Sequence, residues 1–151
     1  MRYVRYAAEG WGVGELVFDG AVLVHSEAPR PGDTVSLGED GLAERLRAYF
    51  GGARDDFLDV GLDLEGLSPF QRAVSDALRA VPYGETVTYG ELAALAGHPN
   101  AQRAAGTFCA HNRFAIVVPC HRVVAAGGLG SYGSLGVGYK RRLLELEHAA
   151  L

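Results

Sequence analysis

The sequence is short of cysteine, of long apolar runs and of basic charge, and each shortage excludes a class of protein. Its 151 residues include two cysteines, Cys109 and Cys120, which cannot build a disulfide framework, so we expect a reduced, cytoplasmic setting. No apolar run approaches the roughly 20 residues that cross a bilayer. The stretch after Met1–Arg5 is not apolar either, so we expect no signal peptide and no membrane partner.

The formal net charge of -4 argues against a nucleic-acid partner, but the charges are unevenly distributed. Residues 1–66 carry 6 Lys or Arg and 13 Asp or Glu, whereas residues 67–151 carry 8 and 5. An acidic first part and a mildly basic second part suggest that a polyanion meets only the second. Chance unevenness in a short chain stays an alternative.

Residues 1–66 have the pattern of a small N-terminal α/β domain. Asp19-Gly20 is a tight-turn signal between two short β patterns, so we expect an antiparallel hairpin there. A helix is predicted where apolar residues recur at helical spacing before Gly51-Gly52. The expected strands cover residues 2–8, 15–18, 21–25 and 57–60, and the expected helix covers residues 42–50.

Residues 67–151 have the pattern of a mostly helical C-terminal domain, which makes the expected fold class α/β (α+β). Ser68 with Gln71, and Thr88 with Glu91, each form the capping-box pattern that begins a helix. Asn100 is expected to cap a third helix. The last two of these helices are joined by a turn of a few residues, which is typical of a helix-turn-helix.

The helix after this turn is nearly bare. Small side chains such as Ala104 and Gly106 cover most of it, and Arg103 is its one long charged side chain. A bare helix can approach another surface closely, so the pattern favours insertion into a nucleic-acid groove, with Arg103 reaching beyond the helix. Tight packing on neighbouring helices would also select alanine and stays an alternative.

The stretch Ile116–Val124 brings together a thiol, an imidazole and a guanidinium. Cys120, His121 and Arg122 follow an apolar run that ends at Pro119, and burying three such groups without a use is costly. We interpret Cys120 as a nucleophile at the end of a strand. A cysteine attacks as a thiolate, so it needs a base, and a histidine that acts as base needs a carboxylate to orient it.

His121 would act after a sharp bend or through a water, because neighbouring side chains on a strand point to opposite faces. We choose Glu147 as its carboxylate, on the inward side of a closing helix predicted over residues 140–147. A helix-turn-helix that leads to such a nucleophile indicates chemistry on DNA. Three other interpretations stay open: a metal site at Cys109, His111, Cys120 and His121, a hydrolytic Cys-His enzyme, and a buried, inert Cys120.

This second part resembles the O6-alkylguanine-DNA alkyltransferases, a family of self-sacrificing DNA repair proteins. Pro119-Cys120-His121-Arg122-Val123 matches the signature of that family. The first part is matched only as an N-terminal α/β domain of variable sequence. The remaining similarity covers Tyr83–Ala93, Ala96-Gly97, Arg103–Gly106, Asn112, Gly130–Tyr132 and the closing helix.

The resemblance implies that the protein transfers a methyl or other alkyl group to Cys120 from O6 of guanine, and from O4 of thymine, in double-stranded DNA. The transfer is stoichiometric and irreversible and needs no cofactor and no metal. A monomer binds the minor groove, and the damaged base rotates out of the helix before the reaction. Relatives that only sense lesions lack the active cysteine.

The same resemblance implies the roles of individual residues. Cys120, His121, Glu147 and Asn112 form the catalytic group, in which His121 acts through water and Asn112 holds the turn before the active-site strand. Tyr89 helps to turn the nucleotide out and binds the base edge. The expected DNA contacts are Tyr89, Arg103, Ala104, Gly106, Arg113 and Arg122, and the expected base pocket is lined by Tyr89, Cys109, Val123, Tyr132 and Gly133.

The sequence departs from the family pattern at several places. Arg113 stands where the family usually has proline, and we expect this added cation to contact phosphate. The segment Tyr132–Lys140 is one residue longer than expected, and Cys109 stands where an apolar side chain is common. The first part lacks the cysteine and histidine ligands of zinc-bearing relatives, so we expect no zinc there.

Overall fold

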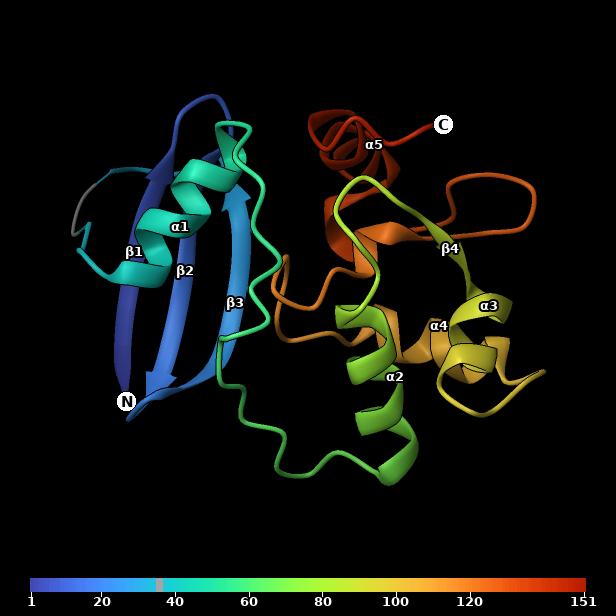
Figure 1. Cartoon of the computed structure of the whole chain (residues 1–151). Helices are drawn as coiled ribbons and strands as arrows, with labels where there is room; N and C mark the ends of the chain where they lie inside the picture. Colours follow the sequence, from blue (N-terminus) through green and yellow to red (C-terminus); the bar gives the residue numbers. More distant parts are fainter. Residues whose placement is uncertain (35–36) are drawn as a thin grey trace. The chain divides into compact units, whose positions relative to one another are not determined.

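The computed structural model describes residues 1–34 and 37–151, which form two compact units (Figure 1). Unit 1 contains residues 1–63 and 113–117, and unit 2 contains residues 64–112 and 118–151. The segment 113–117 thus belongs to unit 1, although unit 2 flanks it on both sides. The division into domains 1–66 and 67–151 stays a prediction. The compact units differ from it at residues 64–66, which belong to unit 2, and at residues 113–117, which belong to unit 1.

Unit 1 is built on an antiparallel sheet with strand order β1–β2–β3. The strands are β1 (Arg2–Ala8), β2 (Gly12–Asp19) and β3 (Val22–Arg30). Gly20 in the turn between β2 and β3 has a φ of 61°, a left-handed conformation that glycine adopts without strain. The predicted hairpin is therefore confirmed, with longer strands than the sequence pattern suggested.

One helix, α1 (Gly41–Phe50), covers a face of this sheet (Figure 1). Asp40 begins it by accepting a hydrogen bond from the Leu42 backbone N–H at 2.9 Å, which satisfies one of the open donors of the first turn. The buried side of the helix contributes Leu46 and Tyr49, both fully buried, to the core of the unit. The predicted helix over residues 42–50 is confirmed.

The strand predicted over residues 57–60 is wrong. Leu58 and Asp59 form a turn, and Phe57 has a positive φ of 53°, far from the dihedral angles of a strand. The apolar pattern reflects the burial of the Phe57 ring, which is 1 % exposed and lies across Tyr49. This part of the chain pairs with β3 instead through a bridge between Leu23 and Leu62.

Unit 2 is mostly helical. It contains α2 (Pro69–Arg79), α3 (Tyr89–Leu95), α4 (Gln102–Ala110), α5 (Val137–Leu146) and two 3₁₀ turns, η1 (Cys120–Arg122) and η2 (Gly133–Leu135). A short parallel pair joins β4 (Val87–Thr88) to β5 (Val123–Val124). This mixture of a small antiparallel sheet and helices confirms the expected α/β (α+β) class.

Both predicted capping boxes are present. The Ser68 hydroxyl accepts from the Gln71 N–H at 3.1 Å while the Gln71 side chain accepts from the Ser68 N–H at 2.8 Å. Thr88 and Glu91 repeat the pattern at the start of α3. These reciprocal bonds satisfy backbone donors that the first turn of a helix leaves open.

The predicted cap at Asn100 is wrong. Asn100 lies in the turn between α3 and α4 with a φ of 71°, and Ala101 precedes the first helical residue without a side-chain cap. A left-handed asparagine is tolerated better than most residues because its short side chain bonds locally. The two helices still pack against one another, so the helix-turn-helix itself is confirmed. Within residues 1–34 and 37–151, no helix combines the length and the apolar character that crossing a membrane requires.

Candidate active site

The backbone that leads to Cys120 is a turn, so the predicted strand before this residue is wrong. Residues 115–117 form turns, and Ile116 has a φ of 73° while its side chain is 2 % exposed. A β-branched residue in this conformation costs on the order of 1–3 kcal/mol, which surrounding structure must offset. The offset comes from β3, where Ser26 exchanges backbone hydrogen bonds with Arg113 and Ala115 at 2.8 and 3.1 Å.

Cys120 is the first residue of η1, and the turn is fixed by one carbonyl. The Val118 carbonyl accepts from the Cys120 N–H at 2.8 Å and from Asn112 Nδ2 at 2.9 Å. Asn112 follows α4, so its side chain ties the end of that helix to the residue before Pro119. The predicted holding role of Asn112 agrees with this geometry.

The carboxylate of Glu147 collects four donors. Oε2 accepts from His121 Nε2 at 2.7 Å and from Arg122 Nη2 at 3.0 Å, and Oε1 accepts from Arg122 Nε at 2.9 Å and from the Gly84 N–H at 3.1 Å. The side chains of His121 and Glu147 are completely buried. The sequence-based choice of Glu147 as the partner of His121 is therefore the arrangement that the structure shows.

The charge states follow from this burial. Burial works to raise the pKa of Glu147, but the hydrogen bonds and charges of His121 and Arg122 outweigh it and hold the pKa far below the ordinary range. Burial lowers the pKa of His121, and Arg122 and Lys140 lower it further, against the opposing effect of Glu147. The imidazole is then neutral, Nε2–H donates to Glu147, and the lone pair lies on Nδ1.

The thiol of Cys120 is protonated in the resting site. Burial is the largest cause that raises its pKa well above the usual range, and the neighbouring Cys109 thiol raises it further. Two groups act in the opposite direction: the positive charge of Lys140 and a hydrogen bond with Asn112. Thiolate formation therefore requires a base at the moment of reaction.

Tyr89, at the start of α3, lies beside this thiol. Glycines leave space for its ring: a Cβ on Gly106 would lie 3.7 Å from Tyr89 Cδ1, and a Cβ on Gly130 would lie 3.3 Å from its hydroxyl oxygen. Burial raises the pKa of Tyr89, as do Cys109 and Cys120, so the hydroxyl is a protonated donor. The interaction with both cysteines places Tyr89 at the site that the sequence predicted for it.

Other predicted pocket residues gather at the same place. Burial raises the pKa of Tyr132, and Cys120, Tyr139 and Cys109 are the next causes, so its ring lies near the two thiols. Val123 is fully buried in β5, directly after η1. Gly133 is exposed at the start of η2, so its place in the pocket stays a prediction.

The bare face of α4 is at the surface. Arg103 and Ala104 are exposed and Gly106 is half-buried, whereas Ala105, on the other side, is fully buried against the unit. One face of α4 therefore packs, as the structural alternative required, and the other is open to a partner. The predicted DNA contacts of these three residues stay predictions that the exposure permits.

Arg122 does not fit its predicted DNA contact. It is 3 % exposed. Its Nε and Nη2 atoms donate buried hydrogen bonds to Glu147, and Nη1 donates to the Val81 carbonyl at 2.8 Å. A guanidinium held this way cannot reach a phosphate without breaking a buried ion pair. Arg113 lies in unit 1 and donates to the Asp63 carbonyl at 3.1 Å, so its phosphate contact stays a prediction.

Lys140 is the site residue that the sequence reasoning missed. It is fully buried, and its ammonium donates to the Ser131 carbonyl at 3.1 Å and lies 5.8 Å from the Tyr89 ring centroid. Burial lowers the pKa of Lys140, while the two cysteines oppose that effect. Helical spacing could have found it, because Lys140, Leu143 and Glu147 lie on one stripe of α5.

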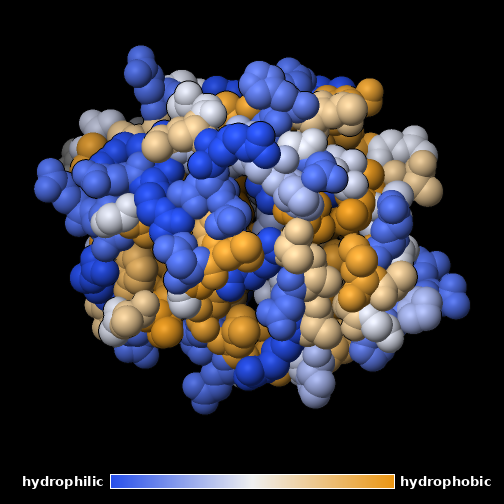
Figure 2. Space-filling model, viewed as in Figure 1, coloured by the Kyte–Doolittle hydropathy of each residue, from blue (hydrophilic) through white to orange (hydrophobic). Residues whose placement is uncertain are grey.

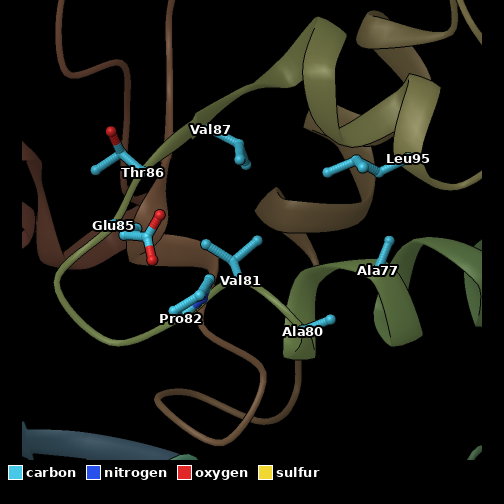
Figure 3. Close-up of a pocket in the computed structure, with 8 residues that line it drawn as sticks. All are labelled: Ala77, Ala80, Val81, Pro82, Glu85, Thr86, Val87 and Leu95. Carbon is cyan, nitrogen blue, oxygen red and sulfur yellow. The ribbon is translucent and has the colours of Figure 1, made fainter.

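An apolar pocket of about 290 Å³ lies elsewhere in unit 2 (Figure 3), where Figure 2 shows apolar surface over α2 and α3. Val81 and Leu95 point into it from opposite sides, and none of the predicted site residues lines it. It borders the site through Val81, whose carbonyl accepts from Arg122, and through Val87, which pairs with Val123. Among the described residues no three His, Cys, Asp or Glu side chains form a metal-binding group, which leaves the alternative metal site without support.

A family model and curated relatives both match this chain to DNA methyltransferases. Residues 69–149 match the family model of the 6-O-methylguanine DNA methyltransferase, DNA binding domain. The methylated-DNA–protein-cysteine methyltransferase of Mycobacterium bovis is 52 % identical over 108 residues, which are 71 % of this chain and 64 % of the relative. That of Methanosarcina acetivorans is 49 % identical over 106 residues, or 70 % and 66 % of the two chains.

Solved structures extend the similarity to both units. The crystal structure of Mycobacterium tuberculosis OGT in complex with DNA superposes with a TM-score of 0.82 at 40 % identity and covers 98 % of this chain and 93 % of that one. The O6-methylguanine-DNA methyltransferase of the archaeon Pyrococcus kodakaraensis gives a TM-score of 0.75 at 27 % identity, with 97 % and 99 % covered. The aligned segment nevertheless spans somewhat less than two thirds of the mycobacterial relative by sequence.

Proposed function

Since this chain belongs to the 6-O-methylguanine DNA methyltransferase family, we propose that it repairs O6-alkylguanine in double-stranded DNA. The alkyl group moves once, and irreversibly, to Sγ of Cys120. The observation that carries the proposal is the meeting of four groups in unit 2: the buried thiol, the His121–Glu147 pair, the Tyr89 hydroxyl and the Lys140 ammonium.

The resting charge states define the first step. Cys120 carries its proton and His121 is neutral, so His121 Nδ1 can take the thiol proton through a bridging water. Glu147 stabilises the imidazolium that forms, and Arg122 keeps that carboxylate in place and ionised. The positive charge of Lys140 stabilises the thiolate.

The transfer itself is a displacement at carbon. The thiolate forms an S–C bond to the alkyl carbon as the C–O6 bond breaks, and guanine leaves with the electron pair. Tyr89, whose hydroxyl is protonated, donates a hydrogen bond to the base edge and so assists the departure. The thioether that forms has no good leaving group, so each molecule reacts once.

Access to the base requires that it leave the duplex. We place the exposed face of α4 in the minor groove, with Ala104 and Gly106 close to the DNA and Arg103 filling the space that the rotated nucleotide vacates. O4-alkylthymine presents the same kind of reacting carbon and is a second substrate. The protein acts as a monomer, in the cytoplasm or at the nucleoid of a prokaryote.

A mass measurement tests the proposal. After incubation with a duplex that contains one O6-methylguanine, the peptide with Cys120 should gain about 14 Da, in a yield of one methyl group per protein. Cys120→Ala should gain nothing while still binding the duplex in a fluorescence-anisotropy titration. Cys109 remains in that variant, so a methyl group found on it, or an unmodified wild-type protein, would refute the assignment.

A further inference from the structure

The two cysteines of the chain meet at the active site. Cys109 lies in the last turn of α4 and Cys120 opens η1, and the two thiols interact with each other and share Tyr89 and Lys140 as neighbours. The proposed alkyl transfer uses Cys120 alone and leaves Cys109 without a chemical role. Two thiols that interact and share these neighbours can form a disulfide, whose sulfur atoms are about 2.05 Å apart, if their side chains rotate toward each other.

The backbone fixes this juxtaposition. The Cys109 carbonyl accepts from the Asn112 N–H at 3.3 Å, and Asn112 Nδ2 donates to the Val118 carbonyl, which also accepts from the Cys120 N–H. Asn112 also bonds the Cys120 thiol through its side chain. The backbones of the two cysteines are therefore joined through Asn112 and the Val118 carbonyl within unit 2, so the two residues stay near each other while the fold is intact.

Exposure and charge favour reaction with a small oxidant. Cys120 is 5 % exposed, but Cys109 is only half-buried and gives a reagent a point of entry. Lys140 interacts favourably with the negative charge of either thiol when it ionises. A thiolate next to a second thiol is the arrangement from which disulfides form.

We propose that Cys109 and Cys120 form a reversible intramolecular disulfide when the protein meets a two-electron thiol oxidant such as a peroxide. Each sulfur loses its proton and the S–S bond forms. The two electrons and two protons reduce hydrogen peroxide to two molecules of water, or an alkyl hydroperoxide to one molecule of alcohol and one of water. A dithiol reverses the reaction. The effect on repair rests on the proposed function. While the disulfide is present, Cys120 cannot act as the nucleophile, and a protein already alkylated at Cys120 cannot form the disulfide.

The experiment treats the reduced full chain with diamide, which takes up two electrons and two protons and leaves no atoms on the protein. The intact mass should fall by about 2 Da, and a non-reducing digest should contain the peptides of Cys109 and Cys120 joined together. The matched variants Cys109→Ser and Cys120→Ser should show neither change. A wild-type chain that keeps two free thiols, or that forms only disulfides between molecules, would overturn the proposal.

A second arm measures the consequence. The rate of methyl transfer from a methylated duplex should fall at least about tenfold in the oxidised wild type and return with dithiothreitol, because the thiolate is the nucleophile. The transfer rate of diamide-treated Cys109→Ser is compared with that of untreated Cys109→Ser. The two rates should differ by less than about twofold. If reduced protein transfers no methyl group, the proposed function fails, yet the linked peptides still decide the disulfide.

Discussion

Two arginine–carboxylate clusters, one in each compact unit, use the same chemical groups in opposite surroundings. In unit 1 Arg45 bonds Asp55 at 2.7 Å and Asp59 at 2.9 Å, and the side chain of Asp59 is 73 % exposed. In unit 2 Arg122 bonds Glu147 at 2.9 Å, with side chains that are 4 % and 0 % exposed. Distance does not distinguish the two clusters, and burial does.

The difference shows what each cluster can do. Water and salt partly screen the charges around Arg45, so that cluster contributes little to stability, although Asp55 also accepts from the Phe57 backbone N–H. Around Glu147 the charged groups are buried away from water. Each is stabilised by its hydrogen-bond and charge partners, so removal of one group leaves the opposite charge buried without compensation. That requirement fixes the carboxylate against His121 Nε2 and hence the tautomer of the imidazole that faces the reaction.

Loss of the buried arginine should have the largest effect. Arg122→Met leaves Glu147 buried without its counter-charge, so the free energy of unfolding should fall by about 3–5 kcal/mol. Urea denaturation followed by circular dichroism measures it. A loss below about 1 kcal/mol would place this pair with exposed ion pairs and contradict the comparison.

Acid should weaken the buried cluster next. The pKa values of His121 and Glu147 lie below their ordinary values of 6.5 and 4.5, so in both cases the unfolded chain binds protons that the folded chain does not. The free energy of unfolding should therefore fall as the pH drops below about 6.5, and again below about 4.5, by up to about 1.4 kcal/mol per pH unit for each group.

Urea titrations across this pH range check the prediction, with one variant from each cluster. Glu147→Gln should lose most of the slope in the lower window. Asp55→Asn should retain most of it, although Arg45 also lowers the pKa of Asp55, because part of that interaction is screened by water. Equal slopes in Glu147→Gln and in the wild type would show that Glu147 is not the titrating group.

Loss of the half-buried Arg45 should have the smallest effect. Arg45→Met, the counterpart of Arg122→Met, should lower the free energy of unfolding by about 1 kcal/mol or less, and this loss should shrink further in high salt. The methionine keeps much of the contact that Arg45 makes over the Phe57 ring. A loss as large as that of Arg122→Met would mean that burial is not what separates the clusters.

Sequence reasoning succeeded where a feature depends on nearby residues, and at one pair of distant residues whose chemistry requires each other. Both capping boxes, the turn at Gly20 and the partnership of His121 with Glu147 agree with the structure. It failed at Ile116, because a run of β-branched residues normally forms a strand, whereas bonds to Ser26 and from Asn112 hold this one in a turn. It also missed Lys140, although helical spacing places it on the buried stripe of α5, because a lysine is ordinarily exposed and this one is fully buried.

The sequence by itself determined three features. Hydrophobic periodicity indicates the order of the elements, capping residues mark the helix starts, and the consecutive residues around Cys120 identify the reactive group. The tertiary structure alone decided that Arg122 turns inward, that Lys140 and Cys109 approach Cys120, and that the resting thiol keeps its proton. The physical reason is that burial and charge compensation depend on residues distant along the chain, and these terms control the chemistry of the site.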